Sequence, residues 1–256
     1  MNSNNSQSIK FSGYVAGLTF AAAALLIVTT APAVAQNVTI GFGEDTGVTE
    51  RAIQIIALVT VLSLAPSILI MVTSFTRIVV VLSLLRTAIG VQASPPNTVV
   101  ISLALFLTAF VMAPVFQKAY ETGVQPLLNE EIELNQAFEK ASGPFQGFML
   151  AHVREKDLEL FLDLSGGEQP STPEEVSLRV LVPAFMISEL KRAFEIGFLL
   201  FVPFIVIDMV VASVLMSMGM MMLPPIIISL PFKLVFFVLV DGWHLVAGSL
   251  VQSYGL

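Results

Sequence analysis

Four long apolar segments constrain the fold of this chain more than any other feature. They span residues 52–91, 98–116, 196–215 and 226–240. The first is about twice the length of roughly 20 residues that one helix needs to cross the hydrocarbon core of a bilayer. Hydrophobic residues make up 55% of the sequence and charged residues only 12%, which excludes a soluble globular domain. We therefore expect an all-α, membrane-associated protein.

Proline and charge interrupt these segments where lipid-facing helices would normally carry neither. Pro203 and Asp208 break the third segment, and Lys233 lies inside the fourth. Arg77 and Arg86 are nine residues apart, so they face roughly opposite sides of a 3.6-residue helix. Irregular backbone and charge at membrane depth are tolerated only inside protein or beside water. The sequence therefore predicts helical hairpins of Pro-broken hydrophobic helices that pack largely against protein.

The first 35 residues have the pattern of a cleaved secretory signal peptide. Lys10 is the only charge before an apolar core over residues 14–28, and the small-x-small triplet Ala33-Val34-Ala35 follows. A retained first membrane helix is the alternative. With cleavage, the mature chain begins outside the cytoplasm at Gln36.

We divide the chain into four parts. Residues 1–35 are the signal peptide, 36–116 the N-terminal hydrophobic helices, 117–188 an acidic extracytoplasmic helical insert, and 189–256 a C-terminal hydrophobic hairpin. Residues 117–188 contain twelve acidic and five basic residues, and this difference equals the whole net charge of -7. This acidity argues against a nucleic-acid partner. Helices are expected over 130–140 and 147–164, with a loop over 165–173.

Charges at the entrance of the third segment conflict with the positive-inside rule. With outside termini and four segments, Arg77 and Arg86 fall inside, as the rule requires, whereas Lys191 and Arg192 fall outside. Either these two bases pair locally with Glu189 and Glu195, or the segments do not cross the bilayer in the usual way.

A methionine-dense turn joins the last two segments. Five of the seven residues 216–222 are Met, and Pro224-Pro225 follows shortly after. Methionine is unbranched, soft and able to repack, so such a cluster favours a binding or sealing surface. An ordinary membrane loop with lipid-facing methionines is the alternative.

Lys233 requires a partner or hydration. It lies roughly 10 Å into its helix, where an unpaired charge costs on the order of 2.5–3.5 kcal/mol. Asp208 and Glu189 are the nearest candidate acids in the sequence, and Arg154 in the insert is a further charge. A pair within one subunit, a pair between subunits and a snorkelling lysine remain open.

Catalytic chemistry has little support in the sequence. Asp208 and Asp241 suggest an intramembrane aspartyl protease, whose chemistry needs paired carboxylates. Because no Gly-x-Gly-Asp arrangement is present, we interpret both as buried polar structural residues. The chain has no Cys, and His152 and His244 form no His-x-x-x-His pair. No phosphate-binding loop or serine elbow occurs. A small-solute transporter, the other alternative, should show internal repeats and a midplane polar site. We expect no enzyme, cofactor or metal.

Three long motifs occur in order in the second half of the chain. They are PAFMISELKRAFEIGF at 183–198, FIVIDMVVASVLMSMGMMMLPP at 204–225 and ISLPFKLVFFVLVDGW at 228–243, with TRIVVVL at 76–82 and PPN at 95–97 upstream. Together they resemble the FliP/SctR family of type III protein-export gate components, over most of the mature chain. A cleavable signal peptide is also known in that family.

The resemblance implies a core subunit of the flagellar type III export gate, forming the channel through which unfolded flagellar proteins cross the bacterial inner membrane. It implies a helical, ring-like multimer with FliQ- and FliR-like subunits at the flagellar basal body, working with FlhA- and FlhB-like proteins. Site residues carried over by motif are Met220, Met221 and Met222 as a pore gasket, Arg154, Glu189 and Lys233 as inter-subunit charged contacts, and Phe148 and Phe161 as subunit-association residues.

Overall fold

The computed structural model describes residues 48–255 except 92–93, 167–171, 173–174 and 221. The predicted signal peptide therefore lies outside the described residues. Contacts divide the chain into residues 1–57 and 58–256, and the packing described below is that of the second unit.

All regular elements in the described part of the chain are helices, which confirms the predicted all-α fold. A π-helical turn at Tyr120–Val124 links two of them. The helices are α2 (Val48–Met71), α3 (Phe75–Ile89), α4 (Asn97–Ala119), α5 (Gln125–Leu128), α6 (Leu134–His152), α7 (Glu155–Ser165), α8 (Leu178–Ser217), α9 (Pro225–Leu239) and α10 (Gly242–Gln252).

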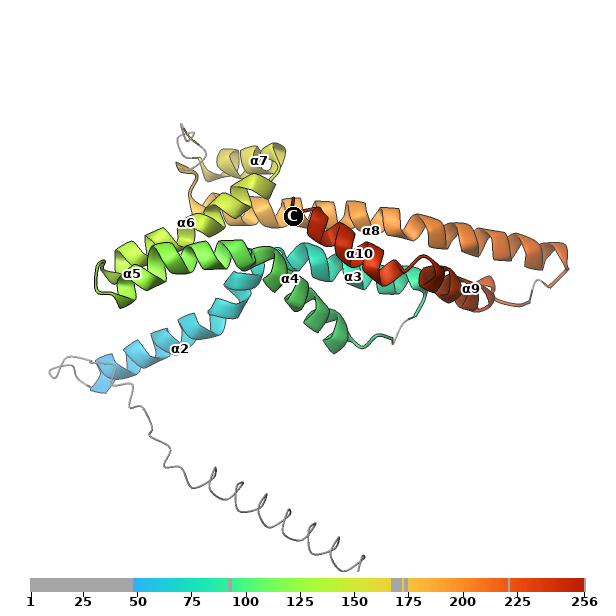
Figure 1. Cartoon of the computed structure of the whole chain (residues 1–256), viewed down its shortest axis with the longest axis horizontal. Coiled ribbons are helices and arrows are strands. Elements are labelled where there is room, and N and C mark those ends of the chain that lie inside the picture. The colour runs from blue at the N-terminus through green and yellow to red at the C-terminus, as the bar shows by residue number, and fades with distance from the viewer. Residues whose placement is uncertain (1–47, 92–93, 167–171, 173–174, 221, 256) are drawn as a thin grey trace, which may run out of the picture. The chain divides into compact units, whose positions relative to one another are not determined.

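Helix α3 lies along α8 at the centre of the fold (Figure 1). Ile78, Val81 and Leu85 are fully buried on α3 because they recur at helical spacing on one face. Gly197 lets the two backbones approach closely, since a Cβ added there would lie 2.3 Å from Leu84 Cδ1. The α3–α8 contact therefore depends on a glycine at this crossing.

A second apolar cluster joins the insert to the beginning of α8. Met149 of α6 is fully buried with Leu181 and Phe185 of α8, and α7 packs against the same helix. Phe161 of α7 is half-buried against this cluster. The insert is thus anchored on the first turns of α8.

Helix α9 folds back on α8 to form a hairpin whose tip is the methionine loop. Helices α9 and α10 then bend by 62°. Asp241 adopts a positive φ of 50° at this bend, and a Cβ at Gly242 would come within 2.1 Å of Phe237. Asp241 is exposed, so its interpretation as a buried polar residue is wrong. The sharp bend places it outside the core.

Proline does not end the helices where the sequence suggested a break. Helix α8 continues without interruption through Pro183 and Pro203, across the expected boundary between residues 188 and 189. Helix α6 likewise runs through Pro144 and joins two segments that we expected to be separate. Each proline removes one backbone donor, but the remaining hydrogen bonds and the packing of neighbouring helices keep a long apolar helix intact.

Within the part of the chain that the structure describes, three helices are long and apolar enough to cross a membrane: residues 52–71, 97–128 and 178–217. The bent pair α9–α10 would be a fourth if it forms one broken span. Helix α3, with 15 residues and two arginines, does not qualify. The spans 97–128 and 178–217 contain the predicted segments 98–116 and 196–215 but extend beyond them into the predicted insert, and the predicted segment 52–91 divides at residues 72–74.

Candidate functional site

Arg77 of α3 and Glu189 of α8 form an ion pair inside the α3–α8 contact. Arg77 Nε donates to Glu189 Oε2 at 2.9 Å, and Arg77 Nη2 donates to Oε1. The side chains are 1% and 0% exposed. A buried pair is tolerated only when its geometry is good and the remaining donors and lone pairs are satisfied. This pair therefore depends on further partners.

The segment after α10 supplies those partners. Arg77 Nη1 donates to the backbone oxygen and the hydroxyl of Ser253, at 3.3 and 3.0 Å. The Tyr254 hydroxyl donates to Glu189 Oε2 at 2.5 Å, and the Arg77 guanidinium carbon lies 3.9 Å from the centre of the Tyr254 ring. Burial and the neighbouring Glu189 carboxylate raise the pKa of the Tyr254 phenol far above its ordinary value, so it remains a donor.

Aromatic rings connect this pair to the insert. Phe148 of α6 stacks on Tyr254, with ring centres 5.8 Å apart, and meets Phe185 of α8 edge-on at 5.9 Å. His152, one turn after Phe148, lies 5.1 Å from Tyr254. The predicted association residue Phe148 is therefore part of the packing within this subunit.

A second ion pair closes the α8–α9 hairpin. Lys233 Nζ donates to Asp208 Oδ2 at 2.7 Å and to the Ala88 carbonyl, in the last turn of α3, at 3.3 Å. The Ser229 hydroxyl donates to Asp208 Oδ1 at 2.5 Å. An ammonium beside a helix C-terminus also interacts favourably with the helix dipole. Lys233 is thus paired within the chain, with one of the two acids the sequence offered.

A third polar group attaches α7 to α8. Arg154 donates from Nε and Nη2 to the Asp157 carboxylate at 2.8 and 2.7 Å, and the Ser188 hydroxyl donates to Asp157 Oδ2 at 2.6 Å. Burial alone would raise the pKa of the Asp157 carboxyl, but the Ser188 and Arg154 donors outweigh it and hold this pKa below its ordinary value.

The three charged residues predicted to bridge subunits, Arg154, Glu189 and Lys233, thus lie in three separate groups. Each has a partner within the chain. Their inter-subunit role stays a prediction. The local pairing proposed for Lys191 and Arg192 is met only in part: Lys191 pairs with Glu195 at 3.5 Å on the surface, whereas Glu189 pairs with Arg77.

Sequence reasoning missed Arg77 and Tyr254 as partners of Glu189. Arg77 lies 112 positions before Glu189, and Tyr254 lies 65 positions after it. The available signal was an arginine within an apolar segment, which indicated protein packing without indicating its partner.

The methionine loop is exposed at the tip of the α8–α9 hairpin. Met222 is 99% exposed and Met220 38%, whereas Met221 lies outside the described residues. Gly219 adopts a φ of +75°, which turns the chain after α8, and Pro225 occupies the first position of α9, where its fixed φ suits a helix start. The two prolines that follow the methionines therefore begin α9 directly after an exposed loop.

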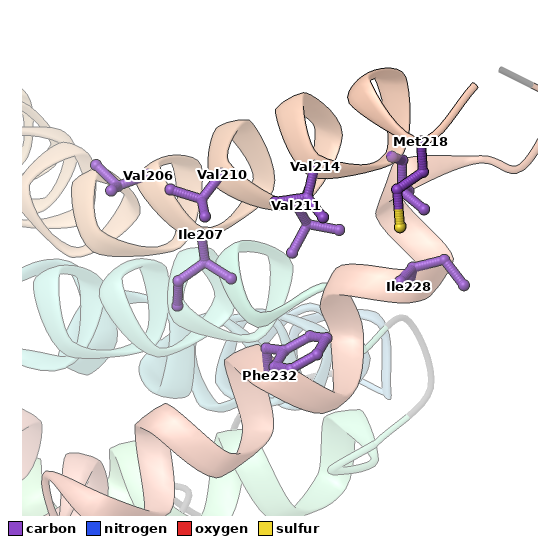
Figure 2. A pocket seen from close by; sticks show the side chains of 9 residues that line it. Val206, Ile207, Val210, Val211, Val214, Met218, Ile228 and Phe232 are labelled. Carbon is purple, nitrogen blue, oxygen red and sulfur yellow. The ribbon is translucent and has the colours of Figure 1, made fainter. Parts of the chain in front are cut away.

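An apolar groove of about 530 Å³ lies between α8 and α9 behind this loop. Figure 2 shows Ile207 and Val211 of α8 pointing toward Phe232 of α9, with Met218 above Ile228 near the tip. The other lining residues are Val206, Val210, Val214 and Leu215. The hairpin thus presents branched aliphatic and thioether side chains to whatever covers it.

The two membrane aspartates do not form a catalytic dyad. Asp208 is half-buried and engaged by Ser229 and Lys233, whereas Asp241 is exposed at the α9–α10 bend. A protease dyad requires two carboxylates that share a site. Among the described residues, no group of three or more His, Cys, Asp or Glu could hold a metal ion.

Comparison with known proteins places these features in a family. The model of the FliP family matches residues 58–250. The flagellar biosynthetic protein FliP of Caulobacter vibrioides is 69% identical over 225 residues, covering 88% of this chain and 85% of the relative. The FliP proteins of Bacillus subtilis and Rhizobium meliloti are 54% and 53% identical, over 79% and 82% of this chain and 91% and 86% of theirs. The chain therefore belongs to the FliP family, as the three motifs of its second half predicted.

Proposed function

We propose that this protein is a core subunit of the flagellar type III protein-export gate and forms part of the channel through which unfolded flagellar proteins cross the inner membrane. The relatives are named as flagellar biosynthetic proteins, which supports the flagellar context. In this role the protein assembles with copies of itself and with FliQ- and FliR-like subunits, and works with FlhA- and FlhB-like proteins.

The α8–α9 hairpin is the observation that carries the proposal. Its apolar side chains are exposed over most of its length, from Met209 at 67% to Met222 at 99%. Exposed apolar surface on this scale marks a contact with protein or membrane. Its charged residues, by contrast, are paired inside the subunit through Asp208 and Lys233. A hairpin whose exposed sides are uncharged and whose tip is a flexible methionine loop is suited to form part of the wall of a protein-conducting channel.

The methionine loop supplies the closing element in this mechanism. Thioether side chains are flexible and polarizable, so they pack against one another when the channel is empty and against a passing chain of any sequence. No charge from the hairpin reaches the tip among the described residues, so ions find no favourable site there. We assign Met220, Met221 and Met222 to this seal.

The seal can be tested by measuring ion leak. Assembled gates in which Met220, Met221 and Met222 are replaced by Ala should form in normal amount and conduct ions more than tenfold faster in planar bilayers, because Ala leaves the constriction open. Met71→Ala, at the exposed end of α2 outside the hairpin, is the matched control. Equal conductance of the triple variant and the wild-type gate would contradict the proposed seal.

A further inference from the structure

Tyr254 is buried although it lies after α10, outside any helix. Tyr254 is only 9% exposed, and it contacts residues of α3, α6 and α8. Its hydroxyl donates to Glu189, with the Ser74 carbonyl a second neighbour at 3.4 Å. One face of its ring meets the Arg77 guanidinium, and Phe148 stacks on it as well. A single side chain thus links the buried ion pair to the insert.

Two of the residues expected to control subunit association meet at Tyr254. Glu189 is fully buried, so it has no surface of its own to offer a neighbouring subunit. Phe148 is half-buried, and its ring contacts Phe185, His152 and Tyr254 of its own chain. Any effect of these residues on association must therefore pass through the position of the helices that carry them, α8 and α6.

We propose that Tyr254 and Arg77 are positioning residues for subunit association, and that they act through Glu189 and Phe148. Arg77 fixes the α3–α8 register by its paired hydrogen bonds to Glu189. Tyr254 then holds Phe148, and with it α6, against this ion pair. The inference rests on the proposed assembly of the gate, and it adds two residues that no motif of the family resemblance assigned to association.

Phe161 offers a matched comparison within the same insert. It is also expected to take part in association, and like Phe148 it packs against the cluster around Met149 and Leu181, but only Phe148 packs in addition against the cluster that contains Tyr254. None of the ring contacts of Tyr254 in the described structure involves Phe161. The arrangement therefore predicts energetic coupling between Tyr254 and Phe148, and independence between Tyr254 and Phe161.

A double-mutant cycle on purified subunits tests this prediction. The dissociation constant of the oligomer is measured by dilution in detergent for Tyr254→Leu, Phe148→Leu, Phe161→Leu and the two double variants that contain Tyr254→Leu. We expect Tyr254→Leu and Phe148→Leu each to weaken association about two- to tenfold, as for the loss of one aromatic pair. The double variant of Tyr254→Leu and Phe148→Leu should associate no more weakly than the weaker-associating of its two single variants. For Tyr254→Leu and Phe161→Leu, the fold-changes in the dissociation constant should multiply.

A conservative variant separates positioning from general destabilisation. Tyr254→Phe keeps the ring against Arg77 and Phe148 and should restore most of the association lost in Tyr254→Leu. If Tyr254→Leu does not fold, Tyr254→Met, which is apolar and of similar length, enters the same cycle. Multiplicative effects of Tyr254 and Phe148, or an unchanged association constant in Phe148→Leu, overturn the inference. Wild-type subunits that do not associate at all contradict the proposed function instead.

Discussion

The two halves of α8 differ sharply in what covers them. Between Leu178 and Gly197 eight residues are buried, and between Phe198 and Ser217 only Phe204 and Leu215 are. The first half is enclosed by α3, α6, α7 and the segment after α10, and it carries the fully buried Glu189. The second half contacts α9 and the α3 core through Phe204 and a few partly buried neighbours, and most of its other side chains are exposed. One continuous helix therefore serves as the core of the subunit at one end and as a surface for assembly at the other.

This difference explains why a single apolar segment contains both charge and exposed hydrophobic surface. In the first half, the subunit itself satisfies the polar groups, so their loss should destabilise the isolated chain. In the second half, exposed valine and methionine side chains are available to contact other subunits or lipid. Substitutions in the first half should therefore act on subunit stability, and those in the second half mainly on assembly and leak.

Glu189→Ala should have the largest effect on the isolated subunit. It leaves Arg77 buried without its counter-charge, which typically costs about 3–5 kcal/mol. Thermal unfolding of the purified subunit in detergent measures the change. Glu195→Ala on the same helix removes an exposed pair with Lys191 and should cost less than about 1 kcal/mol. A Glu189→Ala subunit that unfolds like the wild type but does not assemble would assign Glu189 to a contact between subunits.

Gly197→Val should come next, because an added side chain collides with Leu84 and separates α3 from α8. Overpacking of this kind costs about 1–3 kcal/mol in the stability of the subunit. Leu84→Ala should restore part of that loss by making room. Gly248→Val provides the control, since a Cβ at Gly248 meets nothing within 4 Å. Equal unfolding temperatures of the two valine variants would show that the α3–α8 contact tolerates an added side chain at residue 197.

Lys233→Ala tests the second half of α8 and should destabilise the subunit less, by about 1–2 kcal/mol, because water reaches the half-buried Asp208 carboxylate that remains. The double variant Lys233→Met with Asp208→Asn removes both charges and should recover most of the stability. Hydrogen exchange of α9 measures the opening of the hairpin. Equal exchange in wild type and Lys233→Ala would place the role of this lysine outside the hairpin.

Acid should weaken the attachment of α7 to α8 by a smaller amount. The pKa of Asp157 is lowered by folding, so its stabilising effect is complete above the ordinary value near 3.8 and is lost as the pH falls through the lower, folded value. Limited proteolysis near residue 165 at pH 6 and at pH 3 monitors this release. Asp157→Asn should be cleaved equally at both pH values in that region, and pH-dependent cleavage of that variant would point to another group.

The amino-acid sequence alone determined the all-α fold, the apolar segments and the family. Apolar segments, the methionine turn and the three motifs are local features, and α4, α9 and the hairpin between α8 and α9 follow from them. The requirement of Lys233 for a partner also followed, because an isolated charge at that depth is costly whatever surrounds it. The same reasoning named Asp208, the acid on the preceding segment, as one of two candidate partners.

The tertiary structure alone decided which charges meet and which helices continue. Glu189 pairs with Arg77, 112 positions away, and both rely on Ser253 and Tyr254 from a third region. Such pairings depend on how helices cross, and here that crossing is set by Gly197 and its neighbours. Helix α8 likewise passes through Pro203 because packing around a long helix outweighs the loss of one hydrogen bond. Local preference predicts each helix, whereas only the packed arrangement of all of them determines the partners of its polar residues.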